Sequence, residues 1–351
     1  MRATAKLSVV ESDGTPLFDP DDVAAIRDAL AADLAGRLGP LTVSEGPERF
    51  GGGMDTYVYA FRLAGDISPA WAAPLVLRVF PSMGQVAKAE REAAMQTFAV
   101  EKGILAPKPL LVDTSGTAFG LPFMIMERMR GAPMLSRIKN PLNMPGMLKA
   151  MAALQARLHS LPTDGCPIPY ERPLVDEWLS RSRELVNKFH PAGLDRPLAW
   201  LETHIDMVKD EEPVLTHNDF HPMNLLIDGD RMALLDWPDA ALGDRHCDVA
   251  RTLALLYLAG PLAQSAIERT VLRLLRGYIV SKYRREYESH LPLDVGRIRY
   301  WQVLHAFGVW AQLAVMRQEG EAAIGAREGV LGEIPDSIFP ALESYVDERI
   351  R

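Results

Sequence analysis

Hydrophobic and polar positions change their spacing near residue 130 of the chain. Before that point, short apolar and β-branched runs stand between turn residues, as in Tyr57–Leu63 and Leu75–Phe80. A helical pattern follows over about Gln85–Lys102, and two more short strands are expected near Leu110–Asp113 and Pro122–Met126. Strands on both sides of a single helix predict a small antiparallel sheet with that helix packed against it.

A further helix is expected before the sheet, as an N-terminal addition packed on it. Asp19 suits the N-cap of this helix and Pro20 suits its first position. Apolar residues then recur on one face: Val23, Ile26, Leu30, Leu34 and Leu38. The Gly39-Pro40 pair ends the pattern.

Beyond Gly131-Ala132-Pro133 the spacing becomes helical. Met147, Met151, Leu154 and Leu158 share one helix face, and the other candidate helices are Leu174–Phe189, Leu198–Lys209, Cys247–Leu258, Pro261–Tyr287 and Leu293–Arg317. One stretch differs, because two apolar runs over residues 225–235 flank Asp228-Gly229-Asp230, which predicts a β-hairpin. The expected fold class is therefore α+β, with strands before helices.

Composition places the chain among globular proteins. It has 351 residues, of which 48% are hydrophobic and 24% charged, so one or two domains are expected. The net charge of −8 is spread evenly on either side of residue 129 and argues against nucleic-acid binding, which needs a basic face. Two cysteines, Cys166 and Cys247, fit a reducing compartment. With no signal-peptide core and no membrane-length apolar run, we expect a cytoplasmic protein without membrane partners, monomeric or homodimeric.

The segment Thr216–Trp237 concentrates the candidate chemistry. Asn224 precedes the first strand of the predicted hairpin and Asp236 follows the second, so folding at the turn would make them neighbours. Asp219 lies shortly before Asn224, in a loop constrained by Pro222. Two carboxylates and an amide oxygen form a ligand set that suits Mg²⁺, whose shell is completed by water and phosphates. The segment therefore predicts a metal site at the open end of the hairpin.

The first part of the chain offers groups that would bind phosphate. Arg78 lies in an expected strand and would reach the phosphates, while Glu92, in the following helix, would hold that cation in place. Glu90 is the alternative partner, since helix register read from a sequence varies by a residue or two. Arg78 as an ordinary edge-strand cation is the other interpretation.

A glycine-rich segment precedes the first of these strands. Gly51, Gly52 and Gly53 would let the backbone approach phosphates closely. A plain hairpin turn is the alternative interpretation of the same residues.

The order of these segments resembles the aminoglycoside phosphotransferase / choline kinase family, whose members are small-molecule kinases with a protein-kinase-like fold. The resemblance covers most of residues 50–256. Its motifs are REAAM (91–95), LPFMIMERMRG (121–131), HNDFHPMN (217–224), LLDWPDAALGD (234–244) and CDVARTLALL (247–256). Asn218 stands where glycine is common in the family.

The resemblance implies a role for each candidate residue. Asp219 is implied as the catalytic base or hydroxyl-orienting carboxylate, and Asn224 and Asp236 as the Mg²⁺ ligands. Arg78 takes the place of the phosphate-binding basic residue, and Glu92 that of its helical partner.

Two further groups of residues also match the family. Met126, Glu127 and Met129 lie in the linker whose backbone binds adenine. Asp244 and Asp248 match carboxylates that brace the catalytic loop.

The implied architecture is a two-lobed protein-kinase-like fold. Residues 1–128 would be the N-terminal lobe, with the N-terminal helix, the glycine-rich loop and a small antiparallel sheet that binds the nucleotide. Residues 129–351 would be the mostly helical C-terminal lobe, with the catalytic loop, the metal site and the acceptor site.

The implied activity is Mg²⁺-dependent transfer of the γ-phosphate of ATP or GTP to a hydroxyl of a small acceptor, such as an antibiotic, an amino alcohol or a sugar-like metabolite. The alternative is an inactive, nucleotide-binding pseudokinase with a scaffold or regulatory role, against which the intact Asp219, Asn224 and Asp236 argue. A protein kinase is the third candidate, but Trp237-Pro238 is followed by too little loop for an activation segment.

Three histidines have simpler interpretations. His217 is expected to be structural, bonded to the loop backbone or to Asp236. His221 is expected to be a surface imidazole, and His159 to be buried or to cap its helix. The tryptophans of the helical part are expected in the core. Trp178, Trp301 or Trp310 would form an aromatic cage for a quaternary amine only if they faced the acceptor.

Overall fold

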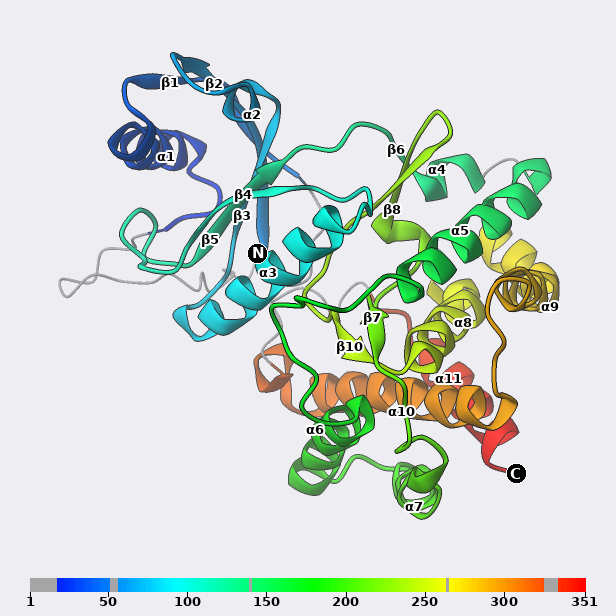
Figure 1. The fold of residues 1–351 in the computed structure, drawn as a ribbon. Coiled ribbons are helices and arrows are strands. Elements are labelled where there is room, and N and C mark those ends of the chain that lie inside the picture. Colours follow the sequence, from blue (N-terminus) through cyan, green and yellow to red (C-terminus); the bar gives the residue numbers. More distant parts are fainter. Residues whose placement is uncertain (1–17, 51–55, 139–140, 263–264, 325–333) are drawn as a thin grey trace. The chain divides into compact units, whose positions relative to one another are not determined.

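The structure is a computed structural model that describes residues 18–50, 56–138, 141–262, 265–324 and 334–351. The chain forms two compact units (Figure 1). The first comprises the chain up to Gly131 together with Asp228–Pro238, and the second comprises Ala132–Ile227 together with Asp239–Arg351. The expected domain limits, 1–128 and 129–351, stay predictions.

The first unit is built on a five-stranded antiparallel sheet with the order β1-β2-β3-β5-β4. Its strands are β1 (Leu41–Arg49), β2 (Tyr57–Gly65), β3 (Leu75–Val79), β4 (Pro109–Asp113) and β5 (Phe123–Glu127). The strands expected from the sequence are thus confirmed within a few residues. In the register of the sheet, Arg78 of β3 stands between Val58 of β2 and Met124 of β5.

Helix α1 (Val23–Leu38) covers one face of this sheet. Its residues Ile26, Leu30 and Leu34 are buried against the apolar side chains of the strands, as their spacing predicts. The expected N-cap was wrong. Asp22, not Asp19, caps the helix, and its carboxylate accepts the N–H of Ala25 at 3.0 Å. The local reason is that Asp19 instead accepts the N–H of Asp21 in the turn before the helix.

Helix α3 (Val86–Glu101) lies on the other face of the sheet and contacts β4 and β5. Strand side chains alternate between the two faces. The odd-numbered residues of β3 therefore join the core beneath α1, whereas Arg78 points to the face that carries α3. The short helix α2 (Pro69–Ala72) and the turn η1 (Met83–Gln85) complete the connections around β3. This alternation places a basic side chain of the sheet next to a helix that bears a buried glutamate.

The second unit is mostly helical. Its elements are β6 (Ala132–Pro133), α4 (Met134–Ile138), η2 (Pro141–Asn143), α5 (Met144–His159), α6 (Leu174–Phe189), α7 (Asp195–Thr203), η3 (Ile205–Met207), β7 (Val214–Thr216), η4 (Pro222–Asn224), β8 (Leu225–Asp228), β10 (Ala241–Gly243), α8 (Arg245–Leu262), α9 (Ala266–Glu288), α10 (Val295–Glu319), η5 (Glu321–Ile324) and α11 (Ile338–Ile350). The helix expected over 198–209 is α7, which begins and ends earlier. Helix α11 had not been expected.

Helix α10 is the centre of this unit and contacts α6, α8 and α11 (Figure 1). Because it is surrounded, it is apolar on most sides, and Trp301, Val303 and Phe307 are fully buried. The short strands β7 and β10 pair antiparallel, with Leu215 opposite Leu242. This pairing places the segment after β7 beside the start of α8.

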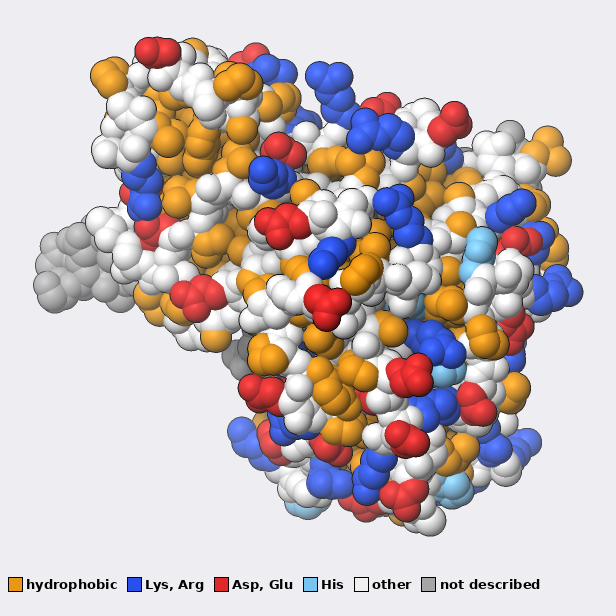
Figure 2. Space-filling view, viewed as in Figure 1, with side chains coloured by type: hydrophobic (Ala, Val, Ile, Leu, Met, Phe, Trp, Pro, Cys, Tyr) orange, Lys and Arg blue, Asp and Glu red, His pale blue; other side chains and the backbone are white. Residues whose placement is uncertain are grey.

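The expected hairpin is also present. Strand β9 (Arg231–Leu234) follows β8 after a turn in which Gly229 has a φ of 59°, a conformation that favours glycine. The division between the two units falls within this hairpin, so β9 and Asp236 belong to the first unit. No helix among the described residues is long and apolar enough to cross a membrane. Acidic and basic side chains are interspersed over the face of the protein shown in Figure 2.

Candidate functional site

The loop after β7 begins with a residue in an unusual backbone conformation. Asn218 has a φ of 59°, in the left-handed region that asparagine tolerates better than most residues. Its side-chain Nδ2 donates to Thr216 Oγ1 at 2.9 Å and to the carbonyl of Asp239 at 3.0 Å. Asparagine can therefore stand where the family often has glycine, because it adopts the same conformation and adds two bonds that fix the loop.

Asp248 of α8 also fixes this loop, through its carboxylate. Its fully buried carboxylate accepts the N–H of His217 at 3.0 Å and that of Asn218 at 2.9 Å. His159 lies 3.0 Å from it through Nε2, and its Nδ1 lies 2.6 Å from the hydroxyl of Tyr287. Burial opposes ionisation of Asp248, but the hydrogen bond from His159 and its charge outweigh it, so the pKa of this carboxyl is lowered. Asp248 thus braces the loop, and His159 is buried as expected.

The loop presents Asp219 with both carboxylate oxygens occupied. Oδ1 accepts from Arg251 Nε at 3.2 Å and Nη2 at 2.9 Å. Oδ2 accepts from Asn224 Nδ2 at 2.9 Å and lies 3.2 Å from His221 Nε2. Burial opposes ionisation, but the charge of Arg251 and the hydrogen bond from His221 hold the pKa of Asp219 far below its usual range. Asp219 is therefore an ionised carboxylate in a fixed orientation.

Of the two histidines beside Asp219, one differs from its simplest interpretation and one matches it. His221, expected as a surface imidazole, has only 16% of its side chain exposed. Besides its contact with Asp219, its Nδ1 accepts the N–H of Met223 at 3.2 Å. His217 is fully buried, and its Nδ1 accepts the N–H of Asp219 at 3.3 Å, so it bonds to the loop backbone as expected.

Asn224 has the chemistry of a metal ligand. Its Nδ2 donates to the backbone carbonyl of Asp219 at 3.0 Å as well as to the carboxylate. Since the amide nitrogen is used in this way, the amide oxygen is the atom left to face a cation. Oxygen donors from amides and carboxylates are those that Mg²⁺ prefers, so the donor set fits this ion.

The first unit brings a second set of residues together around Arg78. Its Nη1 donates to Glu92, whose side chain is fully buried, and its Nη2 lies 2.9 Å from Asp236 Oδ1. Its Nε donates to Thr56 Oγ1 at 3.0 Å. Of the two glutamates considered from the sequence, Glu92 makes the contact, whereas Glu90 is exposed. Arg78 and Glu92 therefore form the expected pair.

Asp236 carries an exposed carboxylate on a constrained backbone. Its φ is 65°, a region that few residues other than glycine adopt, and 40% of its side chain is exposed. Strain of this kind persists where the surroundings impose it, and it is frequent in functional sites. The carboxylate is thus available to a ligand while Arg78 neutralises part of its charge.

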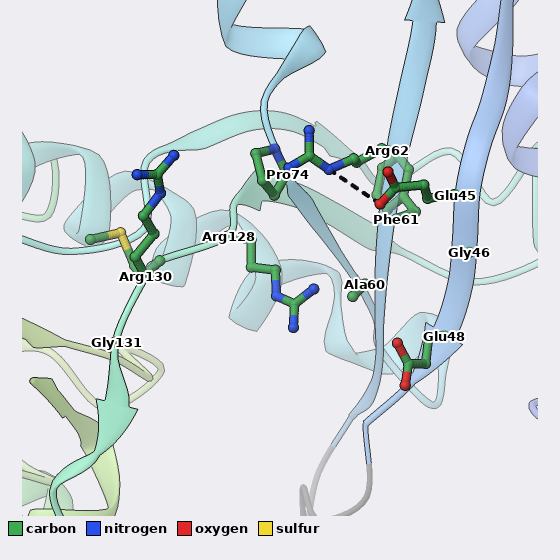
Figure 3. Close-up of a pocket in the computed structure, with 11 residues that line it drawn as sticks. Glu45, Gly46, Glu48, Ala60, Phe61, Arg62, Pro74, Arg128, Arg130 and Gly131 are labelled. Carbon is green, nitrogen blue, oxygen red and sulfur yellow. Dashed lines mark ion pairs between the residues drawn. The ribbon is translucent and has the colours of Figure 1, made fainter. Parts of the chain in front are cut away.

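The linker after β5 borders a cavity of about 400 Å³ in the first unit (Figure 3). Met129 is among its lining residues, as are Arg128, Arg130, Glu48 and the strand β2 residue Ala60. Figure 3 shows the Arg128 side chain extending toward Ala60. A cavity of this size is sufficient for a small-molecule ligand.

The other residues expected to bind the nucleotide do not line this cavity or lie outside the described residues. Met126 and Glu127 are the last residues of β5, and neither lines this cavity as described. Gly51, Gly52 and Gly53 lie outside the described residues.

The candidate residues thus fall into two sets. Asp219 and Asn224 belong to the second unit, whereas Arg78, Glu92 and Asp236 belong to the first. The expected closeness of Asn224 and Asp236 stays a prediction. Within the described ranges, no three His, Cys, Asp or Glu side chains form a metal-binding group. A metal ligand set here would therefore include amide, water or phosphate oxygens, as is usual for Mg²⁺.

Asp244 connects the end of β10 to α10. Its carboxylate lies 2.6 Å from His246 Nδ1 and accepts from Arg297 Nη2 at 3.0 Å and Trp301 Nε1 at 2.9 Å. Trp301 is therefore a buried structural residue, and Trp310 is also buried. Trp178, by contrast, is partly exposed and lies beside Arg251.

Sequence reasoning missed Thr56 and Arg251. Thr56 had no signal of its own, since its bond to Arg78 depends on the pairing of β2 with β3. Arg251 did have one. It follows Asp248 by three residues on α8, and that spacing puts both side chains on the face that meets the loop after β7.

The sheet of the first unit and the helices of the second define a two-lobed, protein-kinase-like α+β fold, with a small antiparallel N-terminal lobe and a mostly helical C-terminal lobe. The comparison with protein families is more specific. The chain belongs to the phosphotransferase enzyme family, whose model matches residues 47–292.

Solved structures support the fold. The chain is 17% identical to a putative aminoglycoside phosphotransferase from Ralstonia eutropha JMP134, with a TM-score of 0.67 over 92% of this chain and 98% of that one. A thermostable variant of aminoglycoside phosphotransferase APH(4)-Ia, bound to ADP and hygromycin B, is 15% identical with a TM-score of 0.62, covering 92% and 98%. The macrolide 2′-phosphotransferase MphH from Brachybacterium faecium is 20% identical with a TM-score of 0.56, covering 88% and 98%.

A curated mouse protein is also similar. The chain is 27% identical over 318 residues to acyl-CoA dehydrogenase family member 10 from Mus musculus. The match covers 84% of this chain but 28% of the mouse protein, so the chain spans little more than a quarter of that relative.

Proposed function

We propose that the protein is a Mg²⁺-dependent small-molecule kinase that transfers the γ-phosphate of ATP or GTP to a hydroxyl group of its acceptor. The observation that carries the proposal is the loop on which an ionised Asp219 and the amide of Asn224 are held together by direct hydrogen bonds. Membership of the phosphotransferase family supports it. Phosphoryl transfer requires little beyond this kind of positioning and charge stabilisation.

The proposed roles follow from the chemistry of each group. Asp219 orients the acceptor hydroxyl and accepts its proton as the new P–O bond forms. The amide oxygen of Asn224 and the carboxylate of Asp236 hold Mg²⁺, which supplies positive charge to the phosphate oxygens. Arg78, fixed by Glu92, adds a forked cation to the same phosphates. These roles require the two sets of residues to act on one nucleotide.

The nucleotide itself would use the first unit. The backbone of Met126, Glu127 and Met129 would bind the base beside the cavity at the linker. Gly51, Gly52 and Gly53 would cover the phosphates. ADP and AMP-PNP occur in the similar APH(4)-Ia structures, which supports a nucleotide here.

In this proposal, residues 1–128 act as the nucleotide-binding lobe and residues 129–351 as the catalytic and acceptor-binding lobe. Cys166 and Cys247 remain thiols, which supports a reducing compartment such as the cytoplasm, with the protein as a monomer or homodimer. The alternative of an inactive pseudokinase finds no support among the relatives.

The acceptor is to be identified by testing a panel of small hydroxyl compounds. Hygromycin B and macrolides are substrates or ligands named for the similar structures, and the mouse relative is named for acyl-CoA dehydrogenases. The panel therefore includes an aminoglycoside, a macrolide, an amino alcohol, a sugar and a hydroxyacyl thioester. Nucleotide consumption is measured with Mg²⁺ and each compound.

The matched variants are Asp219→Ala and Asp230→Ala, the latter an exposed carboxylate in the hairpin turn. Loss of a positioned general base lowers turnover by about 10²- to 10⁴-fold. We expect that loss in Asp219→Ala and wild-type turnover in Asp230→Ala. Full activity of Asp219→Ala with the acceptor that the wild type uses would overturn the mechanism.

A further inference from the structure

Arg251 is the cation that contacts the Asp219 carboxylate. It lies on α8, one helical turn after Asp248, and 18% of its side chain is exposed. Both Nε and Nη2 donate to the same oxygen, Oδ1, at 3.2 and 2.9 Å. Two charge-assisted bonds from a planar guanidinium to one oxygen fix the direction of that oxygen as well as its charge.

An aromatic ring also contacts the guanidinium. The centre of the Arg251 guanidinium lies 5.3 Å from the ring centre of Trp178 on α6, within cation–π range. Trp178 packs edge-on against His305 of α10, with 5.0 Å between the ring centres. Burial lowers the pKa of His305 to about 3, so its imidazole is neutral and adds no charge that would repel Arg251. Arg251 therefore contacts both the indole ring of Trp178 and the Asp219 carboxylate.

The consequence concerns the second oxygen of Asp219. Oδ2 lies near Asn224 and His221, on the side that carries the candidate metal ligand. With Oδ1 fixed by Arg251, rotation of the carboxylate would break two charge-assisted bonds, so Oδ2 keeps one direction. A hydroxyl group reacts well only when the group that orients it is held within a fraction of an ångström.

We propose that Arg251, supported by Trp178, is a positioning residue that fixes the Asp219 carboxylate for the acceptor hydroxyl. The inference rests on the proposed kinase function, because it assigns Arg251 to the same reaction. Arg251 acts through Asp219, because the hydrogen bonds that its guanidinium makes within the described residues all end on that carboxylate.

This arrangement makes a kinetic prediction that a purely structural role does not. Arg251→Gln lowers kcat about 10- to 100-fold, since misplacement of the orienting group by about 1 Å has an effect of that size. The KM for the nucleotide stays within about twofold of wild type, because Arg251 touches no residue assigned to nucleotide binding. Arg251→Lys restores part of kcat, since it keeps the charge but loses the fork.

Trp178 provides an independent variant that leaves the charges intact. Trp178→Leu removes the ring face and lowers kcat about 3- to 10-fold, whereas Trp178→Phe keeps an aromatic face and stays near wild type. Arg245→Gln, on the same helix but bonded to the carbonyl of Pro292, is the matched control and keeps wild-type kinetics. Thermal unfolding of each variant confirms that it is folded.

A double variant tests whether Arg251 acts through Asp219. If it does, Arg251→Gln adds no further loss to Asp219→Ala, because groups that act as a unit are not additive. A wild-type kcat in Arg251→Gln would overturn the proposal. So would a full additional loss in the Asp219→Ala background.

A crystal structure of Arg251→Gln separates this inference from the proposed function. We expect the Asp219 carboxylate to leave its position or to occupy more than one. An unchanged Asp219 overturns the positioning role whether or not an acceptor has been found. By contrast, full activity of Asp219→Ala overturns the kinase mechanism. It does not affect the finding that the Asp219 carboxylate moves in the Arg251→Gln structure.

Discussion

At the scale of single residues, one guanidinium joins three parts of the first unit. Arg78 contacts Thr56 just before β2, Glu92 on α3 and Asp236 after β9. The two carboxylates differ, since Glu92 is fully buried whereas 40% of the Asp236 side chain is exposed. The buried carboxylate fixes the cation, and the partly exposed one has a surface that a ligand could reach.

Removal of the buried charge tests this division. Glu92→Gln keeps the shape of the side chain but leaves Arg78 without its buried counter-charge, which costs about 3 to 5 kcal/mol when one partner of such a pair is lost. We expect a lower melting temperature and an increase of about tenfold in the KM for the nucleotide, measured by calorimetry and steady-state kinetics. Glu90→Gln, an exposed position on the same helix, changes neither. Equal effects of the two substitutions would contradict the pairing.

The sequence was informative at this scale where a residue's partner is set by local structure. An alternating strand and a following helix place Arg78 near the start of that helix, but the choice between Glu90 and Glu92 needed the helix register that the structure supplies. The cap of α1 was misplaced because three aspartates compete within four residues, and only the fold decides that Asp22 faces the helix. Thr56 and Arg251 depend on strand pairing and on helix packing, which no local pattern reveals.

At the scale of elements, helix α6 begins without a side-chain cap of its own. Pro173 precedes it, and the N–H of Leu174 is accepted at 3.3 Å by Glu211, which lies just before β7. Burial, together with the nearby charge of Asp244, raises the pKa of Glu211 to about 7. Glu211 therefore connects the start of α6 to a distant loop, and its charge is unfavourable there.

This shift makes stability depend on pH. The pKa of Glu211 is near 4.5 when unfolded and about 7 when folded, so its contribution is fully present below pH 4.5 and is lost as the pH rises through 7. Glu211→Gln mimics the protonated form. The free energy of unfolding of this variant relative to wild type should therefore rise between pH 5 and 8 by about 1 to 2 kcal/mol. This is less than 1.36 kcal/mol per pKa unit because the carboxyl is partly solvated.

The control for this prediction is the adjacent residue. Glu212 is exposed, and Glu212→Gln should leave the pH dependence as in wild type. A difference between Glu211→Gln and wild type that is constant from pH 5 to 8 would show that Glu211 does not titrate in this range.

Elements with a strong pattern of their own could be predicted. The limits of α6 were found because Pro173 and a long amphipathic run mark them, and β2 and β3 because their apolar runs are bounded by turns. Strands β7 and β10 were missed since each has three residues and pairs with a partner far along the chain. Glu211 was missed for the same reason.

At the scale of the whole molecule, the chain passes between its two units three times, after Gly131, Ile227 and Pro238. The segment between the second and third passages contains Asp236 and belongs to the first unit, although Asn224, shortly before it, stays in the second. The two proposed metal ligands are thus contributed by different units. A metal–nucleotide complex bound by both would stabilise both together.

Ligand-induced stabilisation tests this coupling. A non-hydrolysable ATP analogue with Mg²⁺ at 100 times its Kd stabilises a folded protein by about 2.7 kcal/mol, which corresponds to about 2 to 4 °C for a chain of this size. In EDTA the analogue should still raise the melting temperature, but by less, because Arg78 and the linker cavity can bind it without the metal. Asn224→Ala and Asp236→Asn, one in each unit, should each remove the Mg²⁺-dependent part and keep the part seen in EDTA, whereas Asp230→Asn behaves as wild type. A Mg²⁺-dependent shift that persists in Asn224→Ala would mean that the metal is held by the first unit and the phosphates alone.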